Sequence, residues 1–179
     1  ATMWAMSQLL ELLGNTPLFE IPHARSSSVK VYAKLEWYNP SGSVKDRAAA
    51  RMMTEAQKAG LLDGKILIDA TSGNTGIAYA TYGAALGIPV ELALPENASK
   101  ERKLILENFG VKLHLTSAME GTDGAQRYVK KLVEENPDQY YYPDQYNNDN
   151  NWKAHYEGTG PEIWKQSNES VTHFVAGLG

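Results

Sequence analysis

The stretch that decides the fold of this chain is ILIDATSGNTGIAYATYGAALGIPVELAL, residues 66–94. It begins with a short apolar run at 66–68, which predicts a strand. Small apolar residues from Thr75 to Leu86 then predict a helix that is buried on nearly every side, and the apolar run at 90–94 predicts another strand. Because a strand, a helix and a strand in succession form a βαβ unit, the stretch predicts a parallel sheet.

The same alternation continues on both sides of this unit. Further strands are predicted at 29–35, 111–115, 140–142 and 171–176, the third of them on aromatic content alone. Further helices are predicted from 49 to a left-handed cap at Gly60, from an N-cap at Ser99 to about Gly110, along 125–133, and across 152–165 with a break at 158–161. The fold class is therefore α/β, with open twisted parallel sheets and flanking helices.

The composition is that of an ordinary globular protein and argues against several classes of function. The 179 residues include 17 Lys+Arg and 21 Asp+Glu, a net charge of −4, which disfavours nucleic acid or an anionic membrane as the main partner. The sequence has no Cys, which excludes disulfides, and its 4 His lack the spacing of a helical metal site, so no metal is expected. No apolar run approaches the roughly 20 residues of a membrane span, and no signal peptide opens the chain. We therefore expect a cytoplasmic protein.

The last residues predict a strand at 171–176 that runs into Gly177-Leu178-Gly179. In parallel sheets such a strand leads through a Gly-rich loop to a helix whose N-terminus binds an anion, and no such helix follows here. We expect this chain to be the N-terminal part of a larger protein. Its C-terminal half, on the same or a separate chain, would cover the open sheet edge.

The first stretch suited to chemistry is Asn39-Pro40-Ser41-Gly42-Ser43-Val44-Lys45-Asp46-Arg47. Lys45 falls where this turn meets the first turn of the following helix. There the helix dipole disfavours an ammonium group by roughly 0.3–1 kcal/mol, and burial would act in the same direction. Both effects favour the neutral amine, which forms a Schiff base with carbonyls. The alternative is an ordinary solvated lysine at a helix start.

The second stretch is Thr71-Ser72-Gly73-Asn74-Thr75-Gly76, between a predicted strand and the buried helix. Its glycines allow the backbone to approach a ligand closely, and the N–H groups of the helix start attract an anion. The hydroxyl groups add donors that suit a carboxylate or a phosphate, although plain capping of the helix is the alternative. The spacing differs from the dinucleotide fingerprint and from the P-loop, which disfavours both functions.

Taken together, the two stretches resemble the cysteine synthase (O-acetylserine sulfhydrylase) family of pyridoxal-phosphate enzymes. The resemblance runs in order through nearly the whole chain. Besides the two stretches, the matching segments are Gly14-Asn15-Thr16-Pro17-Leu18, Lys34-Leu35-Glu36, Gln145-Tyr146-Asn147-Asn148, Gly158-Thr159-Gly160-Pro161-Glu162-Ile163 and Val175-Ala176-Gly177-Leu178-Gly179. The stretch at His155-Tyr156 is more similar to the B-type (M-type) enzymes than to the A-type.

The resemblance implies a two-domain, fold type II pyridoxal-phosphate enzyme, present here as its N-terminal part. It divides the chain into an N-terminal segment at 1–36, a smaller α/β domain at 37–148 and the start of the larger cofactor domain at 149–179. It also implies a homodimer.

The resemblance also implies roles for particular residues. Lys45 would form the Schiff base with pyridoxal phosphate, Asn74 would bond the 3′ oxygen of the cofactor ring, and Gly179 would begin the phosphate loop. The residues implied to hold the substrate α-carboxylate are Thr71, Ser72, Thr75 and Gln145.

The implied reaction is a β-replacement through an aminoacrylate, forming L-cysteine or S-sulfocysteine from O-acetylserine or O-phosphoserine and a sulfur donor. Thr122 stands where many members of the family have Met, which leaves the sulfur donor open between sulfide, thiosulfate and a thiocarboxylate. Alternatives are a cystathionine β-synthase, a threonine synthase or dehydratase, a non-catalytic binding subunit, or an anion-binding domain without cofactor. Thr75 favours the cysteine synthases, because dehydratases tend to have His at this position.

Overall fold

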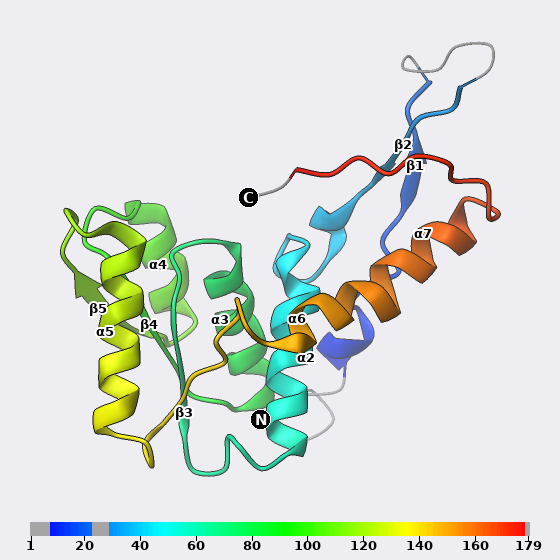
Figure 1. Ribbon diagram of the computed structural model, residues 1–179. Coiled ribbons are helices and arrows are strands. Elements are labelled where there is room, and N and C mark those ends of the chain that lie inside the picture. Colours follow the sequence, from blue (N-terminus) through cyan, green and yellow to red (C-terminus); the bar gives the residue numbers. More distant parts are fainter. Residues whose placement is uncertain (1–7, 23–28, 178–179) are drawn as a thin grey trace.

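The computed structural model describes residues 8–22 and 29–177, and its centre is a parallel sheet (Figure 1). The strands of this sheet are β3 (Ile66–Ala70), β4 (Val90–Pro95), β5 (Lys112–Thr116) and β6 (Tyr140–Tyr141). They lie in the order β5-β4-β3-β6, and each neighbouring pair is parallel. The predicted α/β class is confirmed.

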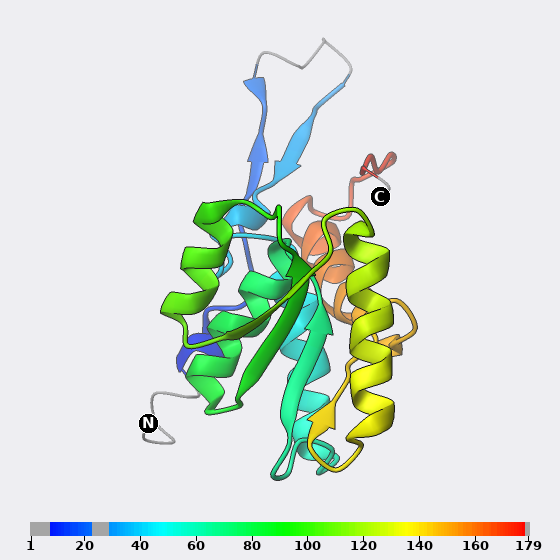
Figure 2. The same ribbon diagram turned by 90° about the vertical axis from the view of Figure 1, so that its left-hand side faces the viewer.

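Helices cover both faces of the sheet, as Figure 2 shows. On one face, α5 (Gly121–Glu135) packs Ala125 and Val129 against Ile68 and Ala93 of the strands. On the other face lie α2 (Lys45–Lys58), α3 (Asn74–Leu86) and α4 (Lys100–Asn108). The larger core lies on this second face, where the alanine, methionine and tyrosine side chains of α2 and α3 are buried together with apolar residues of β3 and β4.

The helix ends follow the predicted capping signals. The Ser99 hydroxyl accepts a hydrogen bond from the Arg102 backbone N–H, 3.3 Å away, at the start of α4. Gly60, just after α2, has a φ of +70°, which is the left-handed conformation that glycine adopts without strain.

The helix α3 is buried on most sides, as its sequence predicted, and it approaches β4 closely at Gly83. A β-carbon at this position would lie 2.5 Å from Val90 Cγ2 and 3.0 Å from the Ile88 carbonyl oxygen. The backbone oxygen cannot rotate away, so the site has no room for a methyl group.

We expect Gly83→Ala to lower the free energy of unfolding by about 2 kcal/mol. Overpacking of this kind costs roughly 1–3 kcal/mol, and the better helix propensity of alanine returns at most about 1 kcal/mol. Urea denaturation would measure the change. In a Val90→Ala background the same substitution should cost less, because the 2.5 Å contact is gone. An equal cost in both backgrounds would contradict the close approach.

The strand order reverses at β3. The chain adds β4 and β5 on one side of β3 and then returns through α5 to place β6 on the other side. In open parallel sheets a reversal of this kind opens a crevice at the carboxyl ends of the strands, because the flanking helices lie on opposite faces. The residues that follow β3 and β6 are therefore expected to line this crevice.

The N-terminal residues form an antiparallel pair, β1 (Leu18–Glu20) with β2 (Tyr32–Lys34), followed by a short turn of helix, η2 (Glu36–Tyr38). The strand predicted at 29–35 is thus present but shorter. After β6 come α6 (Asp149–Ala154), a π-helical turn η3 (His155–Thr159) and α7 (Gly160–Gln166). The predicted helical region is confirmed, but the backbone stays helical through 158–161, and the irregularity is the π-helical turn, which begins earlier, at His155.

The strand predicted at 171–176 is wrong for the described residues. This segment has no regular structure, and Val175 is 93% exposed. A strand forms only beside another strand that accepts and donates its backbone hydrogen bonds, and no strand in the described ranges lies next to it. The predicted residue Gly179 lies outside the described residues.

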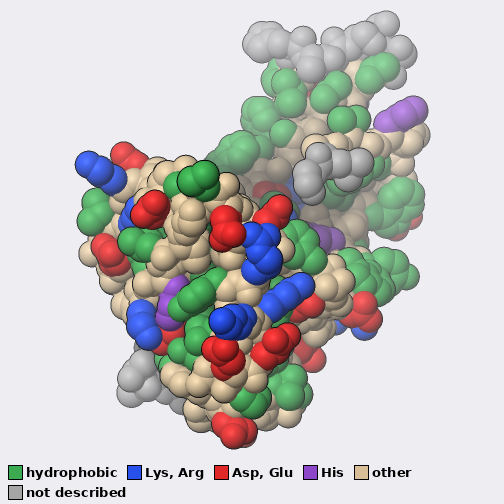
Figure 3. Space-filling model, turned by 60° about the vertical axis from the view of Figure 1, so that its left-hand side comes forward, with side chains coloured by type: hydrophobic (Ala, Val, Ile, Leu, Met, Phe, Trp, Pro, Cys, Tyr) green, Lys and Arg blue, Asp and Glu red, His purple; other side chains and the backbone are tan. Residues whose placement is uncertain are grey.

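The described surface carries mixed charge. On the face in Figure 3, acidic and basic side chains alternate without a large area of either sign. No helix in the described parts of the chain is both long enough and apolar enough to cross a bilayer.

Candidate active site

A cavity of about 590 Å³ lies at the carboxyl ends of β3 and β6, where the strand order reverses. Every site residue that the sequence predicted within the described ranges lines it, although they come from separate parts of the chain. These residues are Lys45, Thr71, Ser72, Asn74, Thr75 and Gln145. The remaining lining residues are Ala70, Gly73, Arg102, Thr122, Tyr146 and Asn151.

Lys45 is the first residue of α2, as predicted, and its side chain is exposed to the cavity rather than buried. Its Nζ has no hydrogen-bond or ion-pair partner in the described part of the chain. The amine is therefore free to react with a ligand in the cavity.

The neighbouring Asp46 holds the turn that positions Lys45. Its buried carboxylate accepts hydrogen bonds from the Ser41 backbone N–H at 2.7 Å and the Ser41 hydroxyl at 2.6 Å. It also accepts from the Ser43 N–H at 3.1 Å and from the Tyr82 hydroxyl of α3 at 2.9 Å. Asp46 thus ties the lysine turn to α3, the helix that begins on the other side of the cavity.

The N-terminus of α3 presents unpaired donors to the cavity. No side chain caps this helix, and the Gly73 carbonyl accepts only from the N–H groups of Gly76 and Ile77. The backbone N–H groups of Asn74 and Thr75 have no acceptor among the described residues. This arrangement disfavours the alternative of plain side-chain capping and leaves a site for an anion.

Six lining residues were not predicted as site residues, and four of them have polar side chains. Arg102 of α4 donates from Nη1 to the Ser72 carbonyl at 2.7 Å, and Asn151 donates to the Gln145 carbonyl at 2.7 Å. Tyr146 follows Gln145, and Thr122 belongs to the first turn of α5. Tyr146 could have been inferred because it lies in a segment that matches the family, and Thr122 because it stands at a position where the family differs. Arg102 lies on a polar surface helix, and only the packing of α4 beside α3 brings it to the cavity.

His155 lies in the π-helical turn, and its Nδ1 is 2.9 Å from the Thr159 hydroxyl. Burial and the positive charges of Arg47 and Lys45 lower the pKa of its imidazole. The neutral form of the His155 imidazole is therefore favoured.

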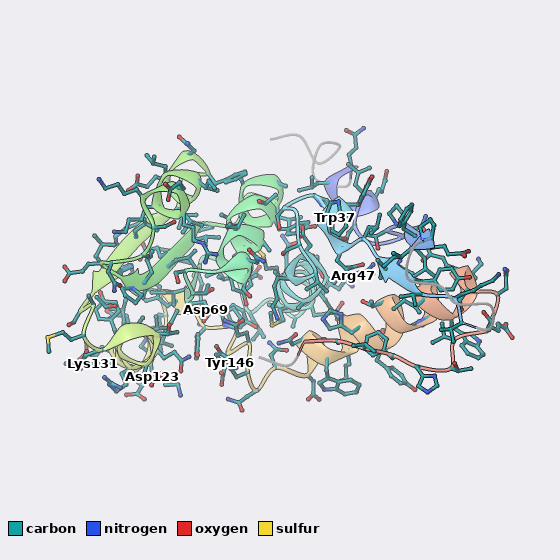
Figure 4. All side chains as sticks on the ribbon, turned by 90° about the horizontal axis from the view of Figure 1, so that it is seen from above. Trp37, Arg47, Asp69, Asp123, Lys131 and Tyr146 are labelled. Atoms are coloured by element: carbon teal, nitrogen blue, oxygen red, sulfur yellow. The ribbon has the colours of Figure 1, made fainter. Side chains whose placement is uncertain are left out.

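Asp69 is buried in β3, directly before the lining residue Ala70, and is labelled in Figure 4. Its Oδ1 accepts from the Ala70 N–H at 2.7 Å, whereas Oδ2 is buried without a hydrogen-bond partner. Burial raises the pKa of this carboxyl from 3.8 to about 6. A raised folded-state pKa means that ionisation between these values destabilises the folded state as the pH rises.

We expect Asp69→Asn to gain stability relative to the unsubstituted protein as the pH rises from 4 to 7, by about 1–3 kcal/mol at about 1.4 kcal/mol per pKa unit. Asparagine keeps the acceptor for the Ala70 N–H but cannot ionise. Unfolding in urea at the two pH values would measure the difference, with Asp63→Asn on the surface as the control for loss of a carboxylate. A difference that does not change with pH would contradict the burial of a titrating group.

Comparison with known proteins shows the family to which this chain belongs. The match to the family of pyridoxal-phosphate dependent enzymes extends over residues 9–179, and the chain belongs to this family.

Within the family, the chain is similar to cysteine synthases. It is 56% identical to a cysteine synthase of Aquifex aeolicus over 98% of this chain and 55% of the relative, and 43% identical to cysteine synthase B of Escherichia coli over 97% of this chain and 57% of the relative. The crystal structure of a cysteine synthase from Entamoeba histolytica superimposes with a TM-score of 0.86 at 40% identity, over 91% of this chain and 50% of that chain. A cystathionine β-synthase from Helicobacter pylori, described as dependent on O-acetylserine, superimposes with a TM-score of 0.85 at 35% identity, over 96% of this chain and 57% of that chain. This chain thus spans about half the length of the relatives that it matches.

Proposed function

We propose that this chain contributes Lys45 and the substrate-binding loop to a pyridoxal-phosphate enzyme that forms L-cysteine from O-acetylserine and a sulfur donor by β-replacement. The observation that carries the proposal is the convergence of an unpaired lysine amine and an uncapped helix N-terminus on one cavity. An amine that binds an aldehyde and a donor set that binds an anion are the two elements that the reaction needs within a few ångströms of each other.

The residues present fit the cofactor. The Lys45 amine has no competing partner in the described ranges, and the exposed Asn74 amide faces the same cavity, free to bond an oxygen of the cofactor ring. No Asp or Glu is among the described lining residues, so the cavity suits an anionic cofactor and an anionic substrate. Gly179, which the family resemblance places at the phosphate loop, lies outside the described residues.

The α3 N-terminus would bind the substrate α-carboxylate. The backbone N–H groups of Asn74 and Thr75 and the hydroxyls of Thr71, Ser72 and Thr75 supply donors on one side, and the Gln145 amide supplies one from the other side of the reversal. These donors orient the substrate so that its Cα hydrogen faces the Lys45 amine, which accepts the proton as general base. Pyridoxal phosphate supplies an electron sink for the charge that forms at Cα.

Synthesis of cystathionine is a second candidate, because the Helicobacter pylori relative carries that name and the first half of the reaction would be the same. The two differ in the nucleophile, so the rates with sulfide and with homocysteine separate them. A non-catalytic binding subunit is less favoured, because the free amine at Lys45 would then have no use.

We also propose the assembly that the resemblance implies. A homodimer, a C-terminal half that completes the cofactor domain, the domain division at 36 and 148, and a cytoplasmic location all belong to this proposal. Light scattering of the purified protein tests the dimer, and a monodisperse monomer would contradict it.

The proposal is tested by incubation of the protein with pyridoxal phosphate, followed by borohydride reduction and peptide mass mapping. The expected result is one cofactor mass increment, on Lys45. The complete protein should show this increment. Addition of O-acetylserine before the reduction should decrease the fraction of Lys45 that carries it. An unmodified Lys45 in the complete protein would overturn the proposed function in favour of a binding subunit.

A further inference from the structure

Asp69 and Tyr79 are two buried polar side chains that the proposed reaction does not use. Asp69 of β3 is 2% exposed, and its Oδ2 has no hydrogen-bond partner among the described residues. Tyr79 of α3 is fully buried, and its hydroxyl donates to the Met52 Sδ of α2, 3.9 Å away. Because a thioether is a weak acceptor, both groups retain unused hydrogen-bonding capacity in the core.

The two groups are close enough to affect each other electrostatically. The Tyr79 hydroxyl lowers the pKa of the Asp69 carboxyl, and the Asp69 carboxylate raises the pKa of the Tyr79 phenol. Burial outweighs the hydroxyl and raises the pKa of Asp69 to about 6, so this carboxyl changes its charge near neutral pH. Tyr79 stays protonated in the same range, because burial holds its pKa well above the usual value.

The elements around Asp69 supply no compensating positive charge. The neighbouring strand β4 places Leu92 beside it, and α2 contributes the uncharged Met52. The segment after β6 contributes Tyr142 and Asp144, and the negative charge of Asp144 raises the pKa of Asp69 further. No Lys, Arg or His in residues 8–22 and 29–177 forms an ion pair with Asp69. A proton is therefore the simplest source of charge compensation for this carboxylate.

The Tyr79 hydroxyl has a different acceptor in each protonation state of Asp69. When Asp69 is protonated, its carboxyl O–H can donate to the Tyr79 oxygen while the Tyr79 O–H donates to Met52, as in the structure. When Asp69 is ionised, its charge attracts the Tyr79 O–H away from the weak thioether acceptor. Rotation of one hydroxyl group thus connects the two states.

The pair lies at both ends of the loop that forms the proposed anion site. Asp69 directly precedes the lining residue Ala70, and Tyr79 lies five residues after Asn74, where α3 begins. The unpaired backbone N–H groups at this helix start attract an anion. An ionised Asp69 places a negative charge behind these donors, and the low dielectric of the core transmits its repulsion to an anion in front of them. Protonation of Asp69 removes this repulsion.

We propose that anion binding at the entry to α3 is coupled to the uptake of a proton by Asp69, with the Tyr79 hydroxyl moving from Asp69 to Met52. The proton comes from solution and forms one O–H bond at the carboxylate, so it offsets the charge of the bound anion. This inference rests on the proposed function, because the anion is the substrate α-carboxylate. Asp69 and Tyr79 do not line the cavity and act as positioning residues.

The test is a calorimetric titration of the complete, cofactor-loaded protein with formate, a carboxylate that stays ionised from about pH 5.5 to 8. Titration in two buffers of different ionisation enthalpy gives both the affinity and the number of protons taken up. A coupling on the order of tenfold is expected for two charges at this range, and linkage makes it reciprocal. Tenfold coupling would raise the pKa of Asp69 by about one unit, so roughly 0.5 proton should be taken up near pH 6.5.

Three variants locate the proton. Between about pH 5.5 and 8, the affinity for formate should fall about tenfold more in the unsubstituted protein than in Asp69→Asn, because asparagine cannot ionise. Tyr79→Phe removes a hydroxyl that lowers the pKa of Asp69, so the midpoint of this fall should move to higher pH. The matched control is Asp63→Asn on the surface, which should behave as the unsubstituted protein.

The outcomes decide for or against the coupling. Equal proton uptake in Asp69→Asn would assign the proton to another group and overturn the proposal, as would formate binding without uptake in the unsubstituted protein. An unchanged midpoint in Tyr79→Phe would overturn the movement of the hydroxyl. Absence of formate binding would also overturn the coupling, whereas the mass increment on Lys45 decides independently whether the proposed function holds.

Discussion

Lys45→Ala should lower kcat/KM for O-acetylserine and sulfide by at least about a thousandfold and leave the free energy of unfolding almost unchanged. The activity falls because the substitution removes both the amine that holds the cofactor and the general base, and a positioned general base alone contributes roughly 10²–10⁴ in rate. The stability is maintained because the Lys45 side chain is exposed and has no partner in the described ranges.

The measurement combines steady-state kinetics of the holoenzyme with urea denaturation. The matched control is Lys58→Ala at the other end of α2, where the lysine forms an exposed ion pair with Glu55. This control should retain full activity and change stability by less than about 1 kcal/mol. Residual activity of Lys45→Ala within tenfold of the unsubstituted protein would refute the role of Lys45.

Arg47→Met should destabilise the protein by about 3–5 kcal/mol. The Arg47 guanidinium is almost fully buried and binds two carboxylates, with Nε and Nη2 at 2.7 and 2.9 Å from Glu36 and Nη1 and Nη2 each 2.7 Å from Glu162. Removal of the arginine leaves two largely buried carboxylates without its positive charge and hydrogen bonds. These unpaired buried charges account for most of the expected loss in the free energy of unfolding.

Acid unfolding offers a second readout for the same variant. Burial raises the pKa of Glu162, but hydrogen bonds from Arg47 and Lys34 outweigh it and lower the pKa from 4.5 to about 2. A lowered folded-state pKa contributes stability above pH 4.5, and this stability is lost as the pH falls towards 2. Arg47→Met should therefore lose less stability than the unsubstituted protein between these pH values.

The control for this prediction is Arg51→Met, one turn further along α2. Arg51 pairs with Glu157 at 2.6 Å, but both side chains are partly exposed, so its loss should cost less than about 1 kcal/mol. Equal destabilisation by the two substitutions would show that the Arg47 cluster contributes no more than a surface ion pair.

The Arg47 cluster explains why segments far apart in the sequence match the family together. Lys34 donates to Glu162 at 2.8 Å and to the Thr16 carbonyl at 2.6 Å, and the Asn15 backbone N–H donates to Glu162 at 2.9 Å. Four of the matching segments, those containing residues 15–16, 34–36, 47 and 162, thus meet in one network between α2, α7 and the N-terminal strands. Their common feature is structural, and none of these side chains lines the cavity.

The predicted elements were confirmed where local signals were strong. The strands β3 and β4 are short apolar runs, and α5 carries an apolar stripe at helical spacing, so local periodicity was sufficient to predict them. The prediction failed at 171–176, where apolar composition alone indicated a strand. A strand depends on a neighbour for its hydrogen bonds, and the described residues provide none there.

The sequence by itself determined the α/β class, the position of Lys45 at the start of α2, and the Gly-rich entry to α3. Each of these depends on interactions within a few residues, such as helix periodicity, capping and the freedom of glycine. Only the tertiary structure decided that Lys45, the α3 entry and Gln145 share one cavity, because the reversal of strand order at β3 brings them together. It alone also placed Arg102 over the Ser72 carbonyl, since the packing of α4 beside α3 sets that contact and no local pattern encodes it.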